Sequence, residues 1–581
     1  MTTRFAISLL LLLIANPLWA VDELIPEAAS GRVALKSATS SVDMAVTANP
    51  HATEAARQML ALGGSAVDAA IAAQLVLGLV EPQSSGLGGG AFLLHWNQSL
   101  GRLQYYDGRE TAPKALTSEH FLDPETGDKQ SFFDAVIGGH SVGTPGVVAL
   151  MAKVHWEHGK LPWAVLFEPA IRLANEGFAI SPRLHTMLVR MPKVAVNPAI
   201  QSYFFERKGD GFVPKAVGTV LRNPAYADTL ELLAKNGASA FYEGPLAKRI
   251  VSAVKHDPNR SGLLSLTDLS EYRALEREPV CGALPLGRKQ YTVCGAAPPS
   301  SGGSTVIAIL GALAAKPLPD IDDPLRAHRF SAVSRLAFAD RNHYIGDPDQ
   351  VWVPLNAMTA PEYLEQRGQS IDDASRQTVA PGDFAERHTA LSPELPSTSH
   401  LSIVDAQGNI VSMTTSIETG FGSRVMVGGF LLNNQLTDFA FQPKDSNGKL
   451  VANAPAPGKR PRSSMSPTIV FEGQKPVLVI GSPGGARIIN YVARVIWDTL
   501  AYEQPLGAAI AAPHMVDIGS KVELEPGAPE HWDAELKAKG HPVVRRAQTS
   551  GLSAIEIRYE QEPVYTGVAD PRREGTAAPS K

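Results

Sequence analysis

Residues 398–416 read TSHLSIVDAQGNIVSMTTS, and this stretch has the pattern of a β-hairpin. Apolar side chains recur along residues 401–405 and again along residues 410–416, and Gln407-Gly408-Asn409 between them is a turn sequence. A long polar segment, residues 380–400, leads into the first run. Thr398 is therefore expected where a polar loop enters a β-strand.

Further strands and helices extend this pattern on both sides of the hairpin. Two more hairpins are expected at residues 469–480 and 555–567, with helices at residues 488–502 and 529–539 between them. Before the hairpin, helical spacing dominates, most clearly at residues 53–62, 66–80, 226–235, 246–255 and 326–342. Residues 21 to about 45 are expected to form an irregular arm. The mixture predicts an α+β fold in which layered sheets are sandwiched by helices.

The segment at residues 63–92 carries the strongest local signals. Gly63-Gly64 ends one expected helix, and Ser65 caps the next, with Asp68 as its capping-box partner. Alanine makes up much of this second helix, so its neighbours can approach closely and the helix should be buried. A glycine loop, SSGLGGG, then leads into an apolar segment at residues 91–96.

Composition narrows the class of protein. Of the 581 residues, 44% are hydrophobic and 19% are charged, as in globular proteins rather than disordered ones. The net charge of -5 argues against nucleic-acid binding as the main function. Two cysteines are too few for a disulfide scaffold or a Cys-rich metal site. Cys281 and Cys294 flank an expected hairpin, and both a bridge and two free thiols fit the sequence.

The N-terminus has the pattern of an export signal. Arg4 precedes an apolar run at residues 7–15 that is too short to cross a bilayer, and Ala20 stands near a cleavage position. A buried N-terminal helix is the alternative. No later segment of the sequence is both long and apolar enough to span a membrane. Residues 1–20 are therefore expected to be a signal peptide, and the protein to be periplasmic or secreted.

Two familiar motifs occur in forms that do not fit their function. Residues 139–143 match the G-x-S-x-G elbow around a nucleophilic serine, but Pro145-Gly146 argues against the helix that must follow Ser141. Residues 86–91 match G-x-G-x-x-A, yet a helix precedes them where a dinucleotide site requires a strand. There is no phosphate-binding P-loop sequence and no H-E-x-x-H zinc helix. No cofactor and no metal is expected.

Thr398 becomes a candidate nucleophile if the chain is cut just before it. A hydroxyl needs a base to attack a carbonyl, and the new α-amine of Thr398 can be that base, because its pKa of about 7.7–8.0 leaves roughly a tenth unprotonated at neutral pH. The same hydroxyl can make the cut by attacking the Ser397 carbonyl. A threonine that merely opens a strand is the structural alternative.

Several blocks of the sequence together resemble the γ-glutamyltranspeptidase (glutathione hydrolase) family of N-terminal-nucleophile hydrolases. They occur in the same order as in the family and span nearly all of the chain after the export signal. They are residues 63–92 described above, YYDGRETAP at 105–113, PPSSGG at 298–303, the hairpin at 398–416, LLNNQLTDF at 431–439, KRPRSSMSPTIV at 459–470, GSPGGARI at 481–488 and ADPRR at 569–573.

The resemblance implies a four-layer αββα sandwich and a precursor that cuts itself. On this basis we expect a signal peptide at 1–20, a large subunit at 21–397 and a small subunit at 398–581, and the two subunits should remain together as a heterodimer. The implied activity is hydrolysis or transfer of the γ-glutamyl group of glutathione or a related amide. The acceptor would be water or the amine of an amino acid or peptide, with no part for nucleic acid or a membrane span.

The resemblance also implies roles for individual residues. Thr398 would be the nucleophile, Ser416 would contact it, and the Gly484-Gly485 backbone would bind the oxyanion. The donor α-carboxylate would be bound by a planar, permanently charged fork, Arg109, with Ser463 and Ser464. The α-ammonium would be held by Gln435 and Asp438.

This chain departs from the family pattern at two places. Ser416-Ile417-Glu418 stands where many members have Thr-x-Asn, so Glu418 brings a carboxylate toward the expected ammonium site. The segment from Asp438 to Ser463 also looks shorter than in members with a lid loop. Three alternatives remain open: a glutaryl or cephalosporin acylase of the same fold, a non-catalytic binding protein that kept the pocket, and an esterase using Ser141.

Overall fold

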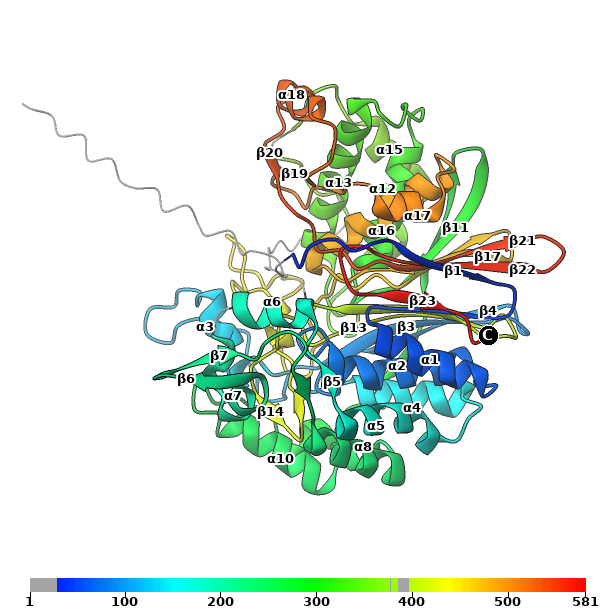
Figure 1. Ribbon diagram of the computed structural model, residues 1–581. Helices are drawn as coiled ribbons and strands as arrows, with labels where there is room; N and C mark the ends of the chain where they lie inside the picture. The colour runs from blue at the N-terminus through cyan, green and yellow to red at the C-terminus, as the bar shows by residue number, and fades with distance from the viewer. Residues whose placement is uncertain (1–28, 192, 377, 385–396) are drawn as a thin grey trace, which may run out of the picture.

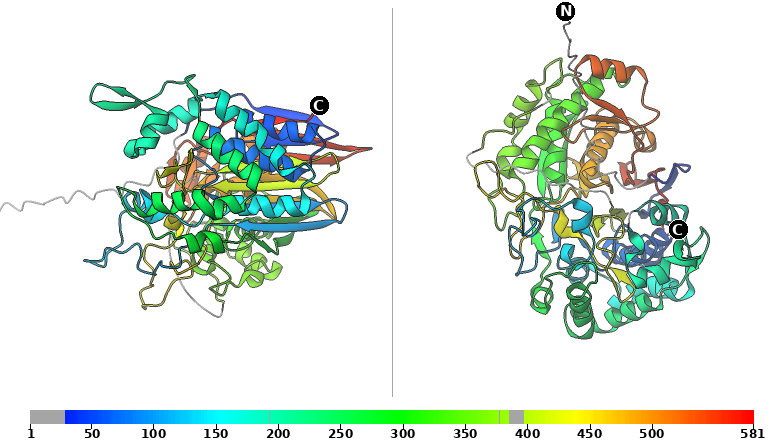
Figure 2. Two further views of the ribbon diagram at one scale, coloured as in Figure 1. Left: turned by 90° about the horizontal axis from the view of Figure 1, so that it is seen from below. Right: turned by 90° about the vertical axis from the view of Figure 1, so that its left-hand side faces the viewer.

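The computed structural model describes residues 29–191, 193–376, 378–384 and 397–581. Within these residues, two seven-stranded sheets stack face to face, and helices cover the outer face of each (Figure 1). The views in Figure 2 show the same layers from two further directions. The α+β prediction and the αββα sandwich implied by the family resemblance are confirmed. The expected signal peptide and most of the polar segment before Ser397 lie outside the described residues.

The first sheet contains the hairpin at residues 398–416. In Figure 1 it is the lower sheet, and its strands pair antiparallel throughout. Leu401 pairs with Met413, and Val404 with Ile410, as the turn at Gln407-Gly408-Asn409 requires. Its order is β23 (Thr576–Ala578), β2 (Met44–Thr47), β12 (Ser399–Val404), β13 (Ile410–Ser416), β3 (Gly90–Asn97), β4 (Arg102–Gly108) and β9 (Leu275–Arg277).

The second sheet contains the other two expected hairpins. Both are confirmed, as are the two helices expected between them, which are α16 (Ile488–Leu500) and α18 (His531–Ala538). The order of this sheet is β1 (Lys36–Ser40), β22 (Pro563–Ala569), β21 (Ser553–Tyr559), β17 (Lys475–Gly481), β16 (Thr468–Glu472), β11 (Lys289–Gly295) and β10 (Val280–Leu286).

The irregular arm expected at residues 21 to about 45 is only partly confirmed, since residues 29–35 form no helix or strand but β1 and β2 occupy residues 36–40 and 44–47. β1 pairs with β22, and β2 lies between β12 and β23 inside the first sheet. Both strands are short, and their partners come from the other end of the sequence. No local pattern therefore marks them.

Helix α2 (Ala66–Val80) lies against the first sheet and is buried along its entire length. The expected capping box is present, since Ser65 and Asp68 each accept a hydrogen bond from the other's backbone N–H. A side chain at Gly78 would come within 2.7 Å of the Tyr226 hydroxyl and 3.2 Å of Gly86. The small residues of α2 therefore allow the close packing that the sequence predicted.

Further helices complete the two outer layers. Those near the first sheet are α1 (Pro50–Ala61), α4 (Val147–His158), α5 (Glu168–Glu176), α8 (Pro224–Asn236) and α10 (Gly244–Lys255), while α12 (Gly302–Ala314), α13 (Pro324–Tyr344), α15 (Pro361–Gln369) and α16 (Ile488–Leu500) lie on the side of the second. Shorter helices are α3 (Phe132–Val136), α6 (Pro182–Arg190), α7 (Pro198–Phe204), α9 (Ser239–Tyr242), α11 (Leu266–Glu271), α14 (Leu355–Met358), α17 (Leu506–Ala511) and α18 (His531–Ala538).

Small sheets lie at the edges of this sandwich. Three of them pair β5 (Phe178–Ala179) with β8 (Val220–Leu221), β6 (Phe205–Lys208) with β7 (Gly211–Pro214), and β14 (Met426–Val427) with β15 (Phe430–Leu431). A fourth joins β18 (Met515–Val516), β19 (Val522–Leu524) and β20 (Val543–Arg545).

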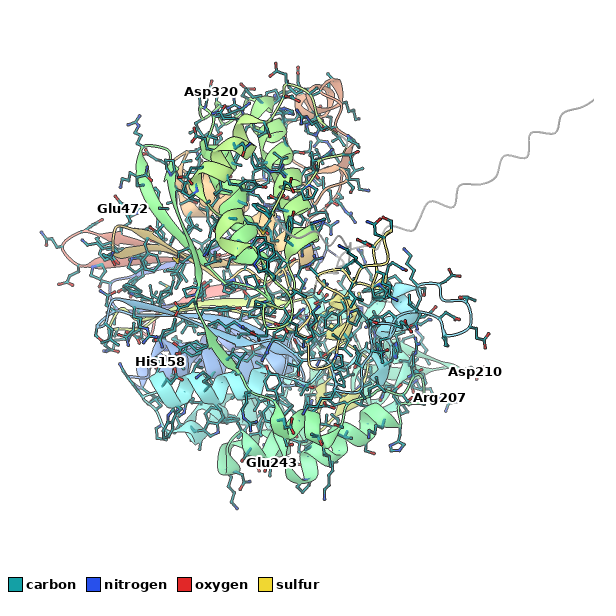
Figure 3. All side chains as sticks on the ribbon, turned by 180° about the vertical axis from the view of Figure 1, so that it is seen from behind. His158, Arg207, Asp210, Glu243, Asp320 and Glu472 are labelled. Carbon is teal, nitrogen blue, oxygen red and sulfur yellow. A yellow bond between two sulfur atoms is a disulfide. The ribbon has the colours of Figure 1, made fainter. Side chains whose placement is uncertain are left out.

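Two large apolar cores hold the layers together. One lies between α1, α2, α4 and the first sheet, and the other lies between the two sheets and beneath α12 and α16. Charged side chains such as Arg207, Asp210, Glu243 and Asp320 are exposed at the periphery (Figure 3). Along the described part of the chain, no helix combines the length and apolarity needed to cross a bilayer.

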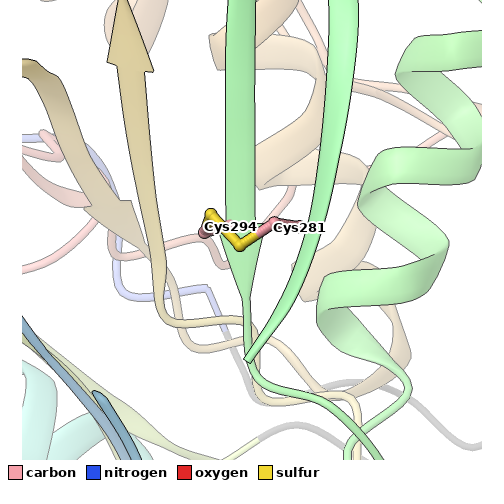
Figure 4. The surroundings of a disulfide bond; sticks show 2 residues. All are labelled: Cys281 and Cys294. Carbon is pink, nitrogen blue, oxygen red and sulfur yellow. A yellow bond between two sulfur atoms is a disulfide. The ribbon is translucent and has the colours of Figure 1, made fainter. Parts of the chain in front are cut away.

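Cys281 and Cys294 form a disulfide between β10 and β11 (Figure 4). The two residues face each other in the register of the hairpin. Of the two states left open by the sequence, the structure contains the bridge.

Candidate active site

The expected cleavage point lies at the start of β12. Thr398 Oγ1 donates a hydrogen bond to Ser416 Oγ at 3.3 Å, and Ser416 Oγ donates to the Ser397 carbonyl oxygen at 2.8 Å. The Glu418 backbone N–H in turn donates to Ser416 Oγ at 2.9 Å. The Ser416 hydroxyl therefore contacts both the candidate nucleophile, Thr398, and the Ser397 carbonyl that Thr398 would attack.

The glycine loop before β3 supports this point from one side. Ser397 Oγ donates to the Gln83 carbonyl, and the Ile417 N–H donates to the Ser84 carbonyl at 3.2 Å. A Cβ atom on Gly89 would come within 2.1 Å of the Ser416 carbonyl oxygen. Glycine is thus required where the loop lies directly against the end of β13.

Arg573 supports the same point from the C-terminal segment. Its Nη1 donates to the Thr398 carbonyl oxygen at 3.1 Å, and its Nη2 donates to the Thr549 carbonyl at 3.0 Å. Burial lowers the pKa of Arg573 to about 10. No role for Arg573 was predicted from the sequence, although ADPRR is one of the blocks that carry the family resemblance.

Arg109 follows β4 and is completely buried. Its Nη2 forms an ion pair with the Asp438 carboxylate and also donates to the Arg462 carbonyl at 3.0 Å. Its Nε donates to the Pro461 carbonyl at 3.1 Å. The structure thus brings together the residue expected to bind a carboxylate and the residue expected to bind an ammonium.

Glu110 lies beside Arg109, with 3.5 Å between its carboxylate and Arg109 Nη1. Burial raises the pKa of Glu110 to about 8, while the Arg109 charge acts in the opposite direction. Near neutral pH a substantial share of Glu110 is therefore protonated.

Gln435 and Asp438 lie on one short helical turn. Gln435 Nε2 donates to the Asp438 carboxylate at 3.2 Å, so the two expected ammonium-binding residues are in direct contact. Glu418 joins this group through Asn434, whose Nδ2 donates to the Glu418 carboxylate at 2.6 Å. Glu418 itself has a left-handed backbone with a φ of 79°, which directs its side chain into this buried region.

Ser463 and Ser464 follow the Pro461-Arg462 segment that contacts Arg109. Ser463 Oγ accepts from the Met465 N–H at 3.1 Å, and Ser464 Oγ accepts from Arg341 Nη2 at 2.6 Å. Ser301, from the PPSSGG block, donates to the Ser463 carbonyl through its backbone and its hydroxyl, both at 2.7 Å. This block therefore fixes the serine pair next to Arg109.

Gly484 and Gly485 form the turn between β17 and α16. Their φ angles of 140° and 58° suit glycine, and a Cβ on Gly484 would come within 2.6 Å of the Tyr491 ring. Gly481, three residues earlier, packs on the His400 ring in β12. The end of β17, from which this turn begins, therefore lies against β12, the strand that Thr398 directly precedes.

Ser141 is not a nucleophile of the elbow type. Its side chain is fully buried, and its Oγ donates to the Val136 carbonyl at 2.6 Å and to the Gly138 carbonyl at 3.2 Å. The next helix begins only at Val147. The esterase alternative is therefore wrong.

Comparisons with known proteins find relatives along nearly the whole chain. Residues 52–580 match the family model described as gamma-glutamyltranspeptidase. The glutathione hydrolase proenzyme of Bacillus subtilis (strain 168) is 33% identical over 551 residues, which cover 92% of this chain and 91% of the relative. The acylase ACY 1 proenzyme of Pseudomonas sp. (strain SE83) is 30% identical over 561 residues, covering 95% and 96%.

A solved structure extends the similarity to the fold. The cephalosporin acylase of Bacillus halodurans superimposes with a TM-score of 0.79 at 27% identity, covering 94% of this chain and 97% of that one. The chain is thus similar both to proteins named glutathione hydrolase and to proteins named acylase.

Proposed function

Because this chain belongs to the γ-glutamyltranspeptidase family, we propose that it is a self-processing hydrolase and transferase of γ-glutamyl amides. Glutathione is the expected type of donor, and water or the amine of an amino acid or peptide is the expected acceptor. Export to the periplasm or the medium is part of the proposal. The Cys281–Cys294 bridge supports it, since disulfides persist in oxidising compartments.

In the first step the precursor cuts itself before Thr398. Thr398 Oγ1 attacks the Ser397 carbonyl carbon, the C–N bond breaks as the ester C–O bond forms, and the hydroxyl proton passes to the leaving nitrogen. This shift frees the Thr398 amine, and water then hydrolyses the ester, which releases the Ser397 carboxylate and restores the Thr398 hydroxyl. Ser416 supports this step, because its hydrogen bond to the Ser397 carbonyl stabilises the charge that develops on that oxygen.

In the catalytic cycle the new α-amine of Thr398 is the base. It takes the Oγ1 proton as the oxygen attacks the γ-carbonyl of the donor, and it delivers that proton to the leaving amine. The γ-glutamyl ester is then cleaved by water or by the acceptor amine. Backbone N–H groups at Gly484-Gly485 would bind the oxyanion, and one such donor is typically worth ~2.7–4 kcal/mol in the transition state.

The contact between Arg109 and Asp438 is the observation that carries the proposed specificity. A γ-glutamyl group has a carboxylate and an ammonium on one carbon, so it needs a cation and an anion side by side. Arg109, with Ser463 and Ser464, provides the cationic side, and Asp438, with Gln435 and Glu418, the anionic side. Such charged contacts contribute ~1.5–3 kcal/mol each.

A glutaryl or cephalosporin acylase is the second candidate. A glutaryl group carries the carboxylate but no ammonium, which would leave Asp438 without a cationic ligand. In this structure Arg109 itself is a partner of Asp438, so that cost is reduced. The similarity to the Bacillus halodurans cephalosporin acylase also supports this second candidate function.

One experiment on purified protein tests the proposal in two stages. Intact mass should show a cut between Ser397 and Thr398 in the wild type and a single chain in Thr398→Ala. The kcat/KM for a γ-glutamyl anilide should then exceed that for the glutaryl anilide by at least about a hundredfold. Asp438→Asn should erode this preference, whereas Arg109→Met should impair both substrates alike.

An uncut yet fully active wild type would refute the mechanism. Comparable kcat/KM values for the two anilides would refute the γ-glutamyl assignment and favour the acylase.

A further inference from the structure

Four buried residues around the proposed donor site form a closed ring of hydrogen bonds. Arg109 donates through Nη2 to the Asp438 carboxylate and to the Arg462 carbonyl. Asn453 completes the ring from the opposite side: its Nδ2 donates to the Asp438 carbonyl at 2.7 Å, and its Oδ1 accepts from the Arg462 N–H at 2.9 Å. Each of the four is at most 4% exposed.

Asn453 connects two segments that lie on either side of it in the sequence, 15 residues before it and 9 residues after it. Asp438 lies on the turn that carries Gln435, whereas Arg462 directly precedes Ser463 and Ser464. One amide group thus spans the anionic side and the cationic side of the donor site. Its side chain bonds to the backbone of Asp438 and to the backbone of Arg462.

Lys459 holds the segment that carries Asn453. Its Nζ donates to the Ala452 carbonyl at 2.7 Å and to the Ala454 carbonyl at 2.9 Å, one on each side of Asn453. Burial lowers the pKa of Lys459 to about 8, although the charge of Asp347 acts in the opposite direction. The side chain is therefore mostly an ammonium at neutral pH, and its hydrogen bonds to the two carbonyls are charge-assisted.

From this geometry we infer that Asn453 is a positioning residue, which sets the separation between the Asp438 turn and the Arg462–Ser464 segment and so aligns Arg109 for a carboxylate ligand. Lys459 supports Asn453 in turn, because its ammonium fixes the backbone on both sides of Asn453. The inference rests on the proposed function only in naming the ligand, because any carboxylate that binds Arg109 depends on the same alignment.

Loss of the Asn453 amide has a definite physical consequence. The Asp438 carbonyl and the Arg462 N–H would lose their bridge inside a buried region, where an unsatisfied polar group is costly. The two segments would then move apart or admit water, and Arg109 would lose the carbonyl and carboxylate that fix its plane. Donor affinity should fall, while the chemistry at Thr398 on its separate strand should change little.

The test compares Asn453→Ala with Asn447→Ala in the self-processed enzyme. Asn447 is exposed on the same connecting segment and is the matched control. We expect Asn453→Ala to raise the donor KM at least tenfold with kcat changed less than threefold, and Asn447→Ala to keep both within twofold. A loss of folded enzyme would instead lower kcat per mole of chain and leave KM unchanged.

Calorimetric titration with L-glutamate and with glutarate gives a readout without turnover. Both affinities should fall at least tenfold in Asn453→Ala. If that variant does not fold, Lys459→Met is compared with Lys449→Met, an exposed lysine of the same segment, and the shift should have the same direction.

The outcomes separate the two proposals. Unchanged affinities and an unchanged KM in Asn453→Ala or Lys459→Met would overturn the positioning role while the proposed function stands. A wild type that binds glutarate but hydrolyses no γ-glutamyl anilide would overturn the proposed function alone. A wild type that binds neither probe would overturn both.

Discussion

In the proposed mechanism, Ser416 contributes a single hydroxyl to two steps, self-cleavage and catalysis, in which the attacked carbonyl differs. In the uncut chain it accepts from Thr398 and donates to the Ser397 carbonyl. After the cut, the Ser397 peptide carbonyl is replaced by a carboxylate that can leave, and the same hydroxyl faces the nucleophile alone. A residue with this dual position should matter more for maturation than for turnover.

We expect Ser416→Ala to slow self-cleavage at least tenfold, because the Ser397 carbonyl loses the donor that stabilises its developing charge. Ser416→Thr keeps the hydroxyl and should stay within threefold of the wild type. Conversion of freshly refolded precursor, followed by denaturing gel electrophoresis, measures both rates. Equal rates for the alanine and threonine variants would remove Ser416 from the mechanism.

His400 lies two residues after Thr398 and is fully buried, with its ring nitrogens near Thr414 Oγ1 and Ser402 Oγ at 2.8 and 3.2 Å. Burial lowers its pKa to about 3. The unfolded chain therefore binds a proton near pH 6.5 that the folded chain resists until about pH 3. The stability contributed by neutral His400 is present above pH 6.5 and is lost as the pH falls through this window.

The prediction concerns the slope of stability against pH in the uncut Thr398→Ala background. Adding His400→Gln should reduce the slope of the unfolding free energy between pH 4.5 and 6.5 by up to about 1.4 kcal/mol per pH unit, the value for one proton. Urea denaturation at several pH values measures it. Parallel curves for the two proteins would show that His400 is not the group resisting protonation.

At the scale of elements, the loop between α2 and β3 acts as a spacer for the end of β13. Gly89→Ala would force a Cβ to within 2.1 Å of the Ser416 carbonyl and 2.8 Å of Ile417 Cγ2. We expect β13 to shift, the Ser416–Thr398 contact to open, and self-cleavage to slow at least tenfold. Gly211→Ala is the control, since nothing lies within 4 Å of its Cβ position. Intact mass against time measures both, and a normal rate in Gly89→Ala would contradict the spacer role.

The elements that sequence reasoning identified are those with local signals. The Ser65–Asp68 capping box and the turn at Gln407-Gly408-Asn409 specify their helix and hairpin within a few residues, and the structure has both. β1 and β2 were missed because short strands owe their place to partners more than 500 residues away, such as the pairing of Thr47 with Thr576. Strand pairing at that distance leaves no periodicity in the sequence.

The residues of the candidate site likewise fall into those that sequence motifs predicted and those that only the folded structure reveals. Arg109, Asp438 and Gln435 were expected from their motifs, and the structure brings them into contact. Arg573 and Asn453 act through backbone carbonyls and N–H groups, which any sequence provides, so only the folded chain shows what they contact. The roles expected for Gly484 and Gly485 stay predictions, since their positive φ angles would equally suit a structural turn.

On the scale of the whole molecule, both sheets contain strands from each side of the proposed cut. In the first sheet β12 and β13 lie between β2 and β3, and in the second β16, β17, β21 and β22 lie between β1 and β11. The C-terminal end is tied down as well, since the Ser580 N–H donates to Asp43 at 2.6 Å and β23 pairs with β2.

We therefore expect the cut enzyme to keep both subunits together. Native mass spectrometry should give a mass equal to the sum of the two subunits. Separating them should require denaturant, because it would break the strand pairing on both sides of the small-subunit strands, which are β12 and β13 in the first sheet and β16, β17, β21 and β22 in the second. The Thr398→Ala precursor gives the single-chain reference. A small subunit that elutes alone from size exclusion under native conditions would contradict this arrangement.

Because the sheets are interleaved, the proposed cut would also make unfolding of the molecule difficult to reverse. Before it, every strand finds its partner within one chain, so assembly is unimolecular, although the many distant pairings make it slow. Afterwards the same assembly requires an encounter between two separate chains, and its rate depends on their concentration. Dilute enzyme that unfolds after maturation should thus seldom recover, and its lifetime is set by the height of the unfolding barrier rather than by an equilibrium.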